Sequence, residues 1–179
     1  LLGGTALLKE AQALSDENEA LKNIFGRKSL KNLVLSRVLA RPNRSPYDTL
    51  IIDIGENFGV RSSALVFAYG NILIGSVEKV YADTSLVSLF STPGREFEAR
   101  IGGNNFLIKA IGQGGGGFEG VLPQALPVNV GDIVVAPTLN RAVLGYVEKV
   151  ITDPRDPFSK ILISAPVPLS ALNYVEVEK

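Results

Sequence analysis

The feature that most constrains this chain is an internal repeat. The segment Gly75–Val80 returns seventy positions later as Gly145–Val150, with Val-Glu-Lys-Val in both copies. The match extends without gaps, so that Ala64–Val66 aligns with Val134–Ala136. Similarity at a fixed offset indicates repeated structural units, although two copies are too few for a solenoid or a propeller. Each copy predicts a β module of strand, tight turn and strand, and chance similarity is the alternative.

The composition excludes several kinds of catalytic site. The chain has 179 residues and contains neither cysteine nor histidine. Without cysteine there are no disulfides and no thiolate metal ligands. Without histidine, the commonest general base near neutral pH and the commonest metal ligand are both missing. We therefore expect no conventional hydrolase, no zinc enzyme and no cofactor.

Charge and hydropathy limit the partners. The 18 basic and 18 acidic residues balance, and no basic run exceeds two residues, so the chain lacks the positive patch of a nucleic-acid binder. No stretch approaches the roughly 18 apolar residues that cross a bilayer. Because the chain opens with Leu1 and Leu2 rather than methionine, we expect a piece of a longer protein, which leaves room for a membrane anchor upstream.

Residues 5–25 predict a helix, because they lack glycine and proline and are rich in good helix formers. Leucine recurs every seven residues there, which predicts a coiled coil between two copies of the chain. The expected dimer interface comprises Leu7, Ala11, Leu14, Asn18, Leu21 and Phe25. Asn18 at a core position favours a parallel pair in one register. A single helix packed on its own domain is the alternative, since about three heptads are near the lower limit for this pattern.

After Lys31 the pattern becomes that of short β-strands separated by turn residues. The predicted strands are Leu33–Arg41, Leu50–Ile54, Ala64–Ala68, Asn71–Tyr81, Leu86–Phe90, Glu96–Ile101, Phe106–Ile111, Phe118–Leu122, Asp132–Ala136, Ala142–Ile151, Lys160–Ser164 and Tyr174–Glu178. Many short strands with turn signals every 8–12 residues are typical of a barrel or a sandwich. If the strands form two small barrels of roughly 70–80 residues each, each barrel alone would be only marginally stable. We therefore expect the two barrels to pack together.

Three candidate sites attract attention. Gly114–Gly117 lacks the lysine and the helix of a phosphate-binding loop, so we interpret it as a flexible hairpin tip. Asp53 and Glu56 are close enough in sequence for an acid–base pair, but acidic residues are common at strand ends. Five aromatic residues belong either to the core or to a contact surface: Phe58, Phe67, Tyr69, Phe106 and Phe118. Any that are exposed become candidates for binding a partner.

Several short motifs together resemble one known family. Thr49–Val60 joins an apolar strand to a Gly-x-Asn-x-Gly-Val turn, Gly75–Val77 gives Gly-x-Val, and Val130–Val135 contains Val-Gly-Asp-x-Val-Val. With the helix before them and the ending Ala165–Val177, they resemble the extracytoplasmic part of the rod-shape-determining MreC family over nearly the whole chain. Two departures are Thr92 before proline, where the family has aspartate, and a short Thr138–Leu144 segment. The shortened segment leaves any role of that loop in doubt.

The resemblance implies a mainly β fold, with an N-terminal coiled-coil helix followed by two small packed β-barrels. We expect residues 1–30 to form the coiled-coil dimerisation helix. Residues 31–55 and 126–179 would form the first barrel, and residues 56–125 the second. Consecutive barrels are the alternative.

The resemblance also implies a function. It points to a non-enzymatic scaffold of the bacterial cell-wall elongation machinery, anchored at the periplasmic face of the inner membrane by a single upstream segment. The partners it implies are a second copy of the chain, a class B penicillin-binding protein, RodA, MreD and the MreB system. A periplasmic adaptor of a transport system is the alternative. A barrel protease or a glycosidase using carboxylates alone is a third reading.

Overall fold

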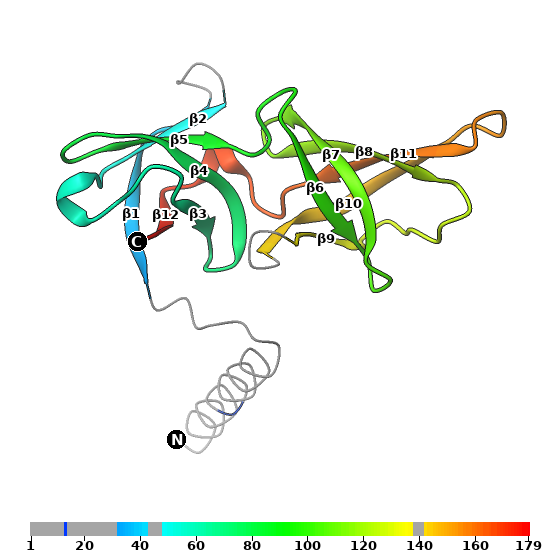
Figure 1. Ribbon diagram of the computed structural model, residues 1–179, viewed down its shortest axis with the longest axis horizontal. Helices are drawn as coiled ribbons and strands as arrows, with labels where there is room; N and C mark the ends of the chain where they lie inside the picture. Colours follow the sequence, from blue (N-terminus) through cyan, green and yellow to red (C-terminus); the bar gives the residue numbers. More distant parts are fainter. Residues whose placement is uncertain (1–12, 14–31, 43–47, 138–141) are drawn as a thin grey trace, which may run out of the picture. The chain divides into compact units, whose positions relative to one another are not determined.

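The computed structural model describes residues 13, 32–42, 48–137 and 142–179 (Figure 1). The predicted coiled coil, with its interface residues Leu7, Ala11, Leu14, Asn18, Leu21 and Phe25, lies outside the described residues. The same holds for residues 138–141 of the shortened segment. The coiled coil therefore remains a prediction.

The described residues form twelve β-strands and two short 3-10 helices. The strands are β1 (Leu33–Ala40), β2 (Thr49–Ile52), β3 (Leu65–Ala68), β4 (Ile72–Val80), β5 (Ser85–Leu89), β6 (Glu96–Ile101), β7 (Phe106–Gly114), β8 (Gly117–Pro123), β9 (Ile133–Ala136), β10 (Ala142–Thr152), β11 (Phe158–Ser164) and β12 (Tyr174–Glu178). The 3-10 helices are η1 (Glu56–Phe58) and η2 (Leu169–Ala171). Each strand overlaps one predicted strand, and the mainly β fold is confirmed.

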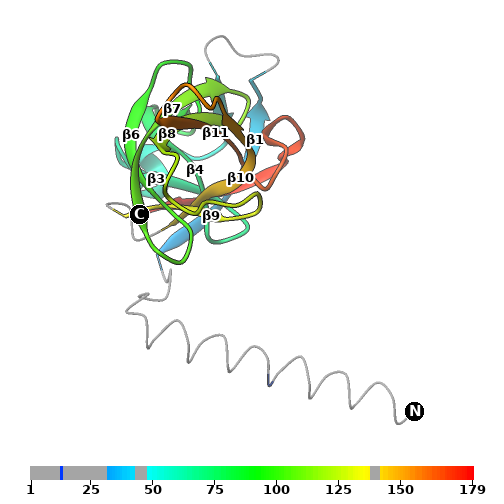
Figure 2. The ribbon, with the colours of Figure 1, turned by 90° about the vertical axis from the view of Figure 1, so that its right-hand side faces the viewer.

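Strands β6 to β11 close into a six-stranded barrel, which we call the inserted barrel. Its strands pair in the order β11-β8-β7-β6-β9-β10, and β10 pairs with β11 to complete the circle. Figure 2 shows these strands around a common centre. Alternate side chains point inward because successive residues of a strand face opposite sides. The core thus includes the fully buried Ala99, Ile101, Val134 and Ile161.

The remaining strands form a second sheet, which we call the terminal sheet. Its order is β4-β3-β12-β1-β2-β5, and β4 pairs with β5, so this sheet closes as well. Five of its strands precede the inserted barrel in sequence and one, β12, follows it. Its separate core includes the fully buried Leu50, Ile52, Val87 and Val177.

The pairing corrects the predicted domain boundaries. Residues 31–55 do share a sheet with the C-terminal strand, but so do β3, β4 and β5, which lie within the range expected for the 56–125 barrel. Conversely, β9, β10 and β11 belong to the inserted barrel rather than to the 126–179 part of the first barrel. The reason is that hydrophobic alternation fixes which face of a strand is buried, whereas it does not specify which distant strand becomes the neighbour.

The two sheets pack against each other. One parallel pair, Val143 with Ile72, joins β10 to β4. Phe67 and Leu73 of the terminal sheet belong to the hydrophobic cluster of the inserted barrel.

The glycine-rich turn between β7 and β8 adds a polar contact between the sheets. The Gly115 amide donates to Asp48 Oδ1 (3.2 Å), and the Gly116 amide donates to Ser91 Oγ (3.0 Å). The Ser91 hydroxyl in turn donates to Asp48 Oδ2 (2.7 Å). Gly114–Gly117 is therefore a hairpin turn, as expected, but it is docked on the terminal sheet and is not a free tip.

The two closed sheets follow the same strand plan. Each strand of the terminal sheet has the same two neighbours as its counterpart in the inserted barrel, where β12, β1, β2, β3, β4 and β5 correspond to β6, β7, β8, β9, β10 and β11, respectively. The registers agree: Val66 lies opposite Gly75 as Val134 lies opposite Gly145. The terminal sheet is thus a circularly permuted version of the inserted barrel, with its first strand supplied from the far end of the chain.

The sequence repeat lies in the corresponding strands β4 and β10. In both strands the register with the next strand shifts by one residue, so that Glu78 and Glu148 occupy equivalent β-bulges. The preceding strands correspond at a different offset, since Ala64–Val66 matches Asp132–Val134 rather than Val134–Ala136. The cause is the number of residues in each connection, since residues 137–141 separate β9 from β10 whereas residues 69–71 separate β3 from β4.

Candidate interaction surface

Of the two candidate acid–base residues, Asp53 stabilises the fold through its side chain. Asp53 Oδ1 accepts hydrogen bonds from Ser36 Oγ (2.9 Å) and from the Arg37 amide (2.7 Å), which ties β1 to the end of β2. Glu56 is exposed at the start of η1. In the part of the chain that the structure describes, no group of three or more acidic residues could hold a metal ion.

The five aromatic candidates separate into core and surface. Phe67 and Phe118 are buried, and both belong to the cluster of the inserted barrel. Phe106 is half-buried. Phe58 in η1 and Tyr69 at the β3–β4 turn are exposed, so they are the two that could contact a partner.

A more extensive apolar surface lies on the outside of the inserted barrel. We define the β9 face as Ile133 and Val135 of β9 with Val143 and Tyr146 of β10. Ile133 pairs with Tyr146 and Val135 with Val143, so the four side chains are direct cross-strand neighbours. Ile133 is 58% exposed and Tyr146 39%. They face outward because the alternate residues of β9, Val134 and Ala136, fill the core.

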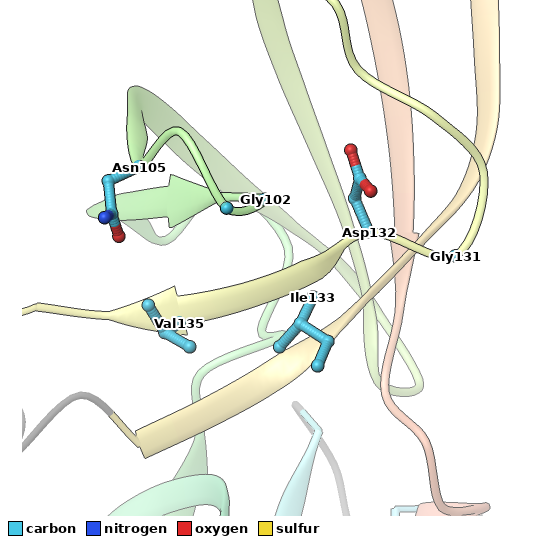
Figure 3. Close-up of a pocket in the computed structure, with 7 residues that line it drawn as sticks. Gly102, Asn105, Gly131, Asp132, Ile133 and Val135 are labelled. Carbon is cyan, nitrogen blue, oxygen red and sulfur yellow. The ribbon is translucent and has the colours of Figure 1, made fainter. Parts of the chain in front are cut away.

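A shallow hollow of about 440 Å³ adjoins the β9 face (Figure 3). Its lining comprises Gly102, Gly103, Asn105, Gly131, Asp132, Ile133 and Val135. The Gly102 amide donates to the Ile133 carbonyl (3.0 Å), which ties the β6–β7 turn to β9.

Figure 3 shows Ile133 and Val135 on one side of β9 and the side chain of Asp132 on the other. Asp132 Oδ2 accepts from the Asn129 amide (2.9 Å), so this carboxylate closes the preceding loop. The surface that a partner would meet on β9 is therefore apolar.

The corresponding face of the terminal sheet already forms a protein contact. Leu65, Phe67 and Leu73 are the counterparts of Ile133, Val135 and Val143 by register. Phe67 and Leu73 are only 2% and 1% exposed, because they pack into the cluster of the inserted barrel. This face is thus buried against the inserted barrel in the terminal sheet, whereas the equivalent β9 face of the inserted barrel is exposed. The β9 face is therefore the best candidate for binding a partner.

The closed sheets and the apolar outer face define a β-barrel protein whose candidate site is a binding surface. The chain belongs to the MreC family: the family model described as rod shape-determining protein MreC, barrel core, matches residues 38–179. No sequence among curated proteins matches the chain. Among the described residues, no helix is long and apolar enough to span a membrane.

Solved MreC structures share the fold. MreC from Pseudomonas aeruginosa is 21% identical, with a TM-score of 0.73 over 82% of this chain and 99% of that one. MreC from Listeria monocytogenes is 26% identical, with a TM-score of 0.70 over 98% of this chain and 90% of that one. The structure of a complex between a penicillin-binding protein and MreC from Helicobacter pylori is 12% identical, with a TM-score of 0.56 over 82% and 96% of the two chains.

Proposed function

We propose that this chain is a non-enzymatic scaffold of the cell-wall elongation machinery, which controls cell shape by dimerising and by binding peptidoglycan-synthesis proteins. The observation that carries the proposal is the match to the MreC barrel core over residues 38–179. It is supported by the Helicobacter pylori relative, which was solved in complex with a penicillin-binding protein. RodA, MreD and the MreB system complete the proposed set of partners.

The proposed location is the periplasmic face of the inner membrane, with a single anchor upstream of this chain. Support comes from another structure with the same fold, described as the major periplasmic domain of the cell shape-determining filament MreC. That structure is 20% identical, with a TM-score of 0.60 over 81% of this chain and 93% of that one.

We propose that the chain acts by positioning the enzymes that it binds. The β9 face would bind a wall-synthesis enzyme, and the coiled coil would hold two copies of that face together. Linking two binding modules raises the effective concentration of the second site without any new contact.

Retention of membrane proteins on the immobilised chain tests this function. From a detergent extract of the source bacterium's membrane, we expect the wild-type chain to retain a penicillin-binding protein. Ile133→Asp should reduce retention at least about tenfold, because it places a carboxylate in an apolar contact. Val121→Asp is the matched control, since Val121 is 52% exposed on β8 of the same barrel, and it should retain the enzyme normally.

Two outcomes would count against the proposal. Normal retention by the folded Ile133→Asp variant would exclude the β9 face as the partner surface. Retention of transporter subunits in place of wall-synthesis proteins would favour the adaptor. Such adaptors usually carry a long helical hairpin within the β portion, whereas the only helices after residue 32 in the described part of the chain are η1 and η2.

Dimerisation has its own test. Leu14→Glu should halve the sedimentation mass, because it places charges at the centre of the predicted coiled-coil seam. The β content in circular dichroism should stay unchanged, since the strands begin at Leu33. Gln12→Glu, outside the heptad core, is the control and should remain dimeric. A Leu14→Glu chain with the wild-type mass would refute the coiled coil.

A further inference from the structure

A half-buried arginine lies on the outer face of the terminal sheet. Arg95 Nη1 donates to the Leu89 carbonyl (3.3 Å) and to Ser88 Oγ (3.5 Å), and Nη2 donates to Ser76 Oγ (3.3 Å). The guanidinium carbon lies 4.2 Å from the centre of the Phe90 ring. Burial lowers the pKa of Arg95, and the charge of Glu78 acts in the opposite direction. Two serines, a carbonyl, a ring and a carboxylate therefore form a cradle for a guanidinium.

The inserted barrel contains the corresponding positions. By strand register, Tyr146 is the counterpart of Ser76, Ser164 of Ser88, Glu148 of Glu78 and Ala165 of Leu89. The backbone supports this match: the Ala165 amide donates to Gly116, as the Leu89 amide donates to Asp48 (2.8 and 3.2 Å). We call these four residues the second cradle.

The second cradle has no arginine in the equivalent place. Arg95 lies six residues after Leu89, and the residue six positions after Ala165 is Ala171. A shallow hollow of about 450 Å³ lies there, lined by Tyr146, Ser164, the glycine-rich turn and Ala165–Pro168. Within the described residues, Glu148 forms no ion pair, and its Oε2 accepts a hydrogen bond from the Ser164 hydroxyl.

We propose that the second cradle binds the guanidinium group of an arginine side chain presented by a partner protein. Glu148 supplies the opposite charge, while the Ala165 carbonyl and Ser164 Oγ offer acceptors for the planar N–H groups. A serine hydroxyl has lone pairs to spare, so Ser164 can accept from the guanidinium and still donate to Glu148. Tyr146 provides a ring on which a guanidinium stacks better than an ammonium does.

The second cradle adjoins the β9 face, because Tyr146 belongs to both. A protein seated on that face could therefore insert an arginine into the cradle. The inference itself does not depend on the identity of that protein, since it rests on the correspondence with the Arg95 site.

An NMR titration of the whole chain with N-acetyl-arginine amide tests the proposal. We expect saturable shifts of the backbone amides of Tyr146, Glu148, Ser164 and Gly114–Gly117. The citrulline analogue has nearly the same shape without the charge and should cause no saturable shift, while the lysine analogue should bind more weakly. Glu148→Gln should weaken arginine binding about tenfold or more, as expected for loss of a charged hydrogen-bond partner.

Two further variants make the test specific. Glu98→Gln changes an exposed carboxylate on β6 of the same barrel and should leave binding unchanged. Tyr146→Ser installs the residue of the terminal sheet, and should weaken binding severalfold while keeping the preference for arginine over citrulline.

The proposal is overturned if the arginine compound gives no saturable shift at these amides. It is equally overturned if citrulline binds as well as arginine, or if a folded Glu148→Gln variant binds like the wild type. None of these results bears on retention of a penicillin-binding protein through Ile133, so the two proposals can fail separately.

Discussion

Replacing Gly145 by alanine is expected to lower the free energy of unfolding by about 3 kcal/mol. The added Cβ would lie 2.3 Å from the Ser164 carbonyl oxygen and 2.9 Å from its carbon. These are backbone atoms of the paired strand β11, so they cannot move away without disturbing the β10–β11 hydrogen bonds. Chemical denaturation followed by circular dichroism measures the loss.

The repeat and an open glycine provide the controls. Gly75 occupies the equivalent place in β4, where a Cβ would lie 2.5 Å from the Ser88 carbonyl oxygen, so Gly75→Ala should cost a similar amount. At Gly103 a Cβ would meet nothing within 4 Å, and Gly103→Ala should change stability by less than about 0.5 kcal/mol. A Gly145→Ala chain as stable as Gly103→Ala would show that the two strands are not packed as described.

Truncating Phe67 to alanine is expected to cost about 4 kcal/mol. Phe67 is 2% exposed, and although it is a residue of the terminal sheet, it packs into the cluster of the inserted barrel. The substitution therefore leaves a cavity between the two sheets. Thermal and chemical unfolding should both report the loss.

Val135 is the matched control for Phe67, because it holds the corresponding place on β9. It is only partly buried and faces the open surface, so Val135→Ala should cost less than about 1 kcal/mol. Similar losses from the two variants would contradict the finding that this face is buried in one sheet and open in the other. In the retention assay the order of the two variants should be reversed. Val135→Ala should reduce retention of a partner more than Phe67→Ala does, because Val135 lies on the β9 face.

The strands could be predicted from the sequence because their signals are local. Glu96–Ile101 and Tyr174–Glu178 were placed correctly at both ends, since alternating side chains and flanking turn residues mark each of them. The mainly β fold follows from the same signals. The coiled-coil interface from Leu7 to Phe25 also rests on a local pattern and stays a prediction.

The grouping of strands into sheets could not be predicted in the same way. β3 pairs with β12 across the whole length of the inserted barrel, and no local pattern records that choice. The docking of Gly115 and Gly116 on Asp48 and Ser91 was missed for the same reason, because those residues meet only after both sheets have closed.

The binding surface was predicted only in part. Aromatic residues were the sequence-based candidates, yet Phe67 and Phe118 are buried. The β9 face was missed because Ile133, Val134 and Val135 are all apolar. Without alternation between apolar and polar residues, the sequence does not indicate which side chains face outward. The repeat relates the faces of the two sheets, but its ungapped alignment pairs Phe67 with Pro137. The strand register pairs Phe67 with Val135 instead.

The position of β12 in the terminal sheet has a consequence during protein synthesis. β12 lies between β3 and β1, and it leaves the ribosome only after the entire inserted barrel. The nascent chain can therefore complete the inserted barrel while β1 and β3 still have unpaired edges, which are sites for aggregation and proteolysis. Translation halted before residue 174 would leave those edges open, so cellular proteases could distinguish an interrupted chain from one that has received β12.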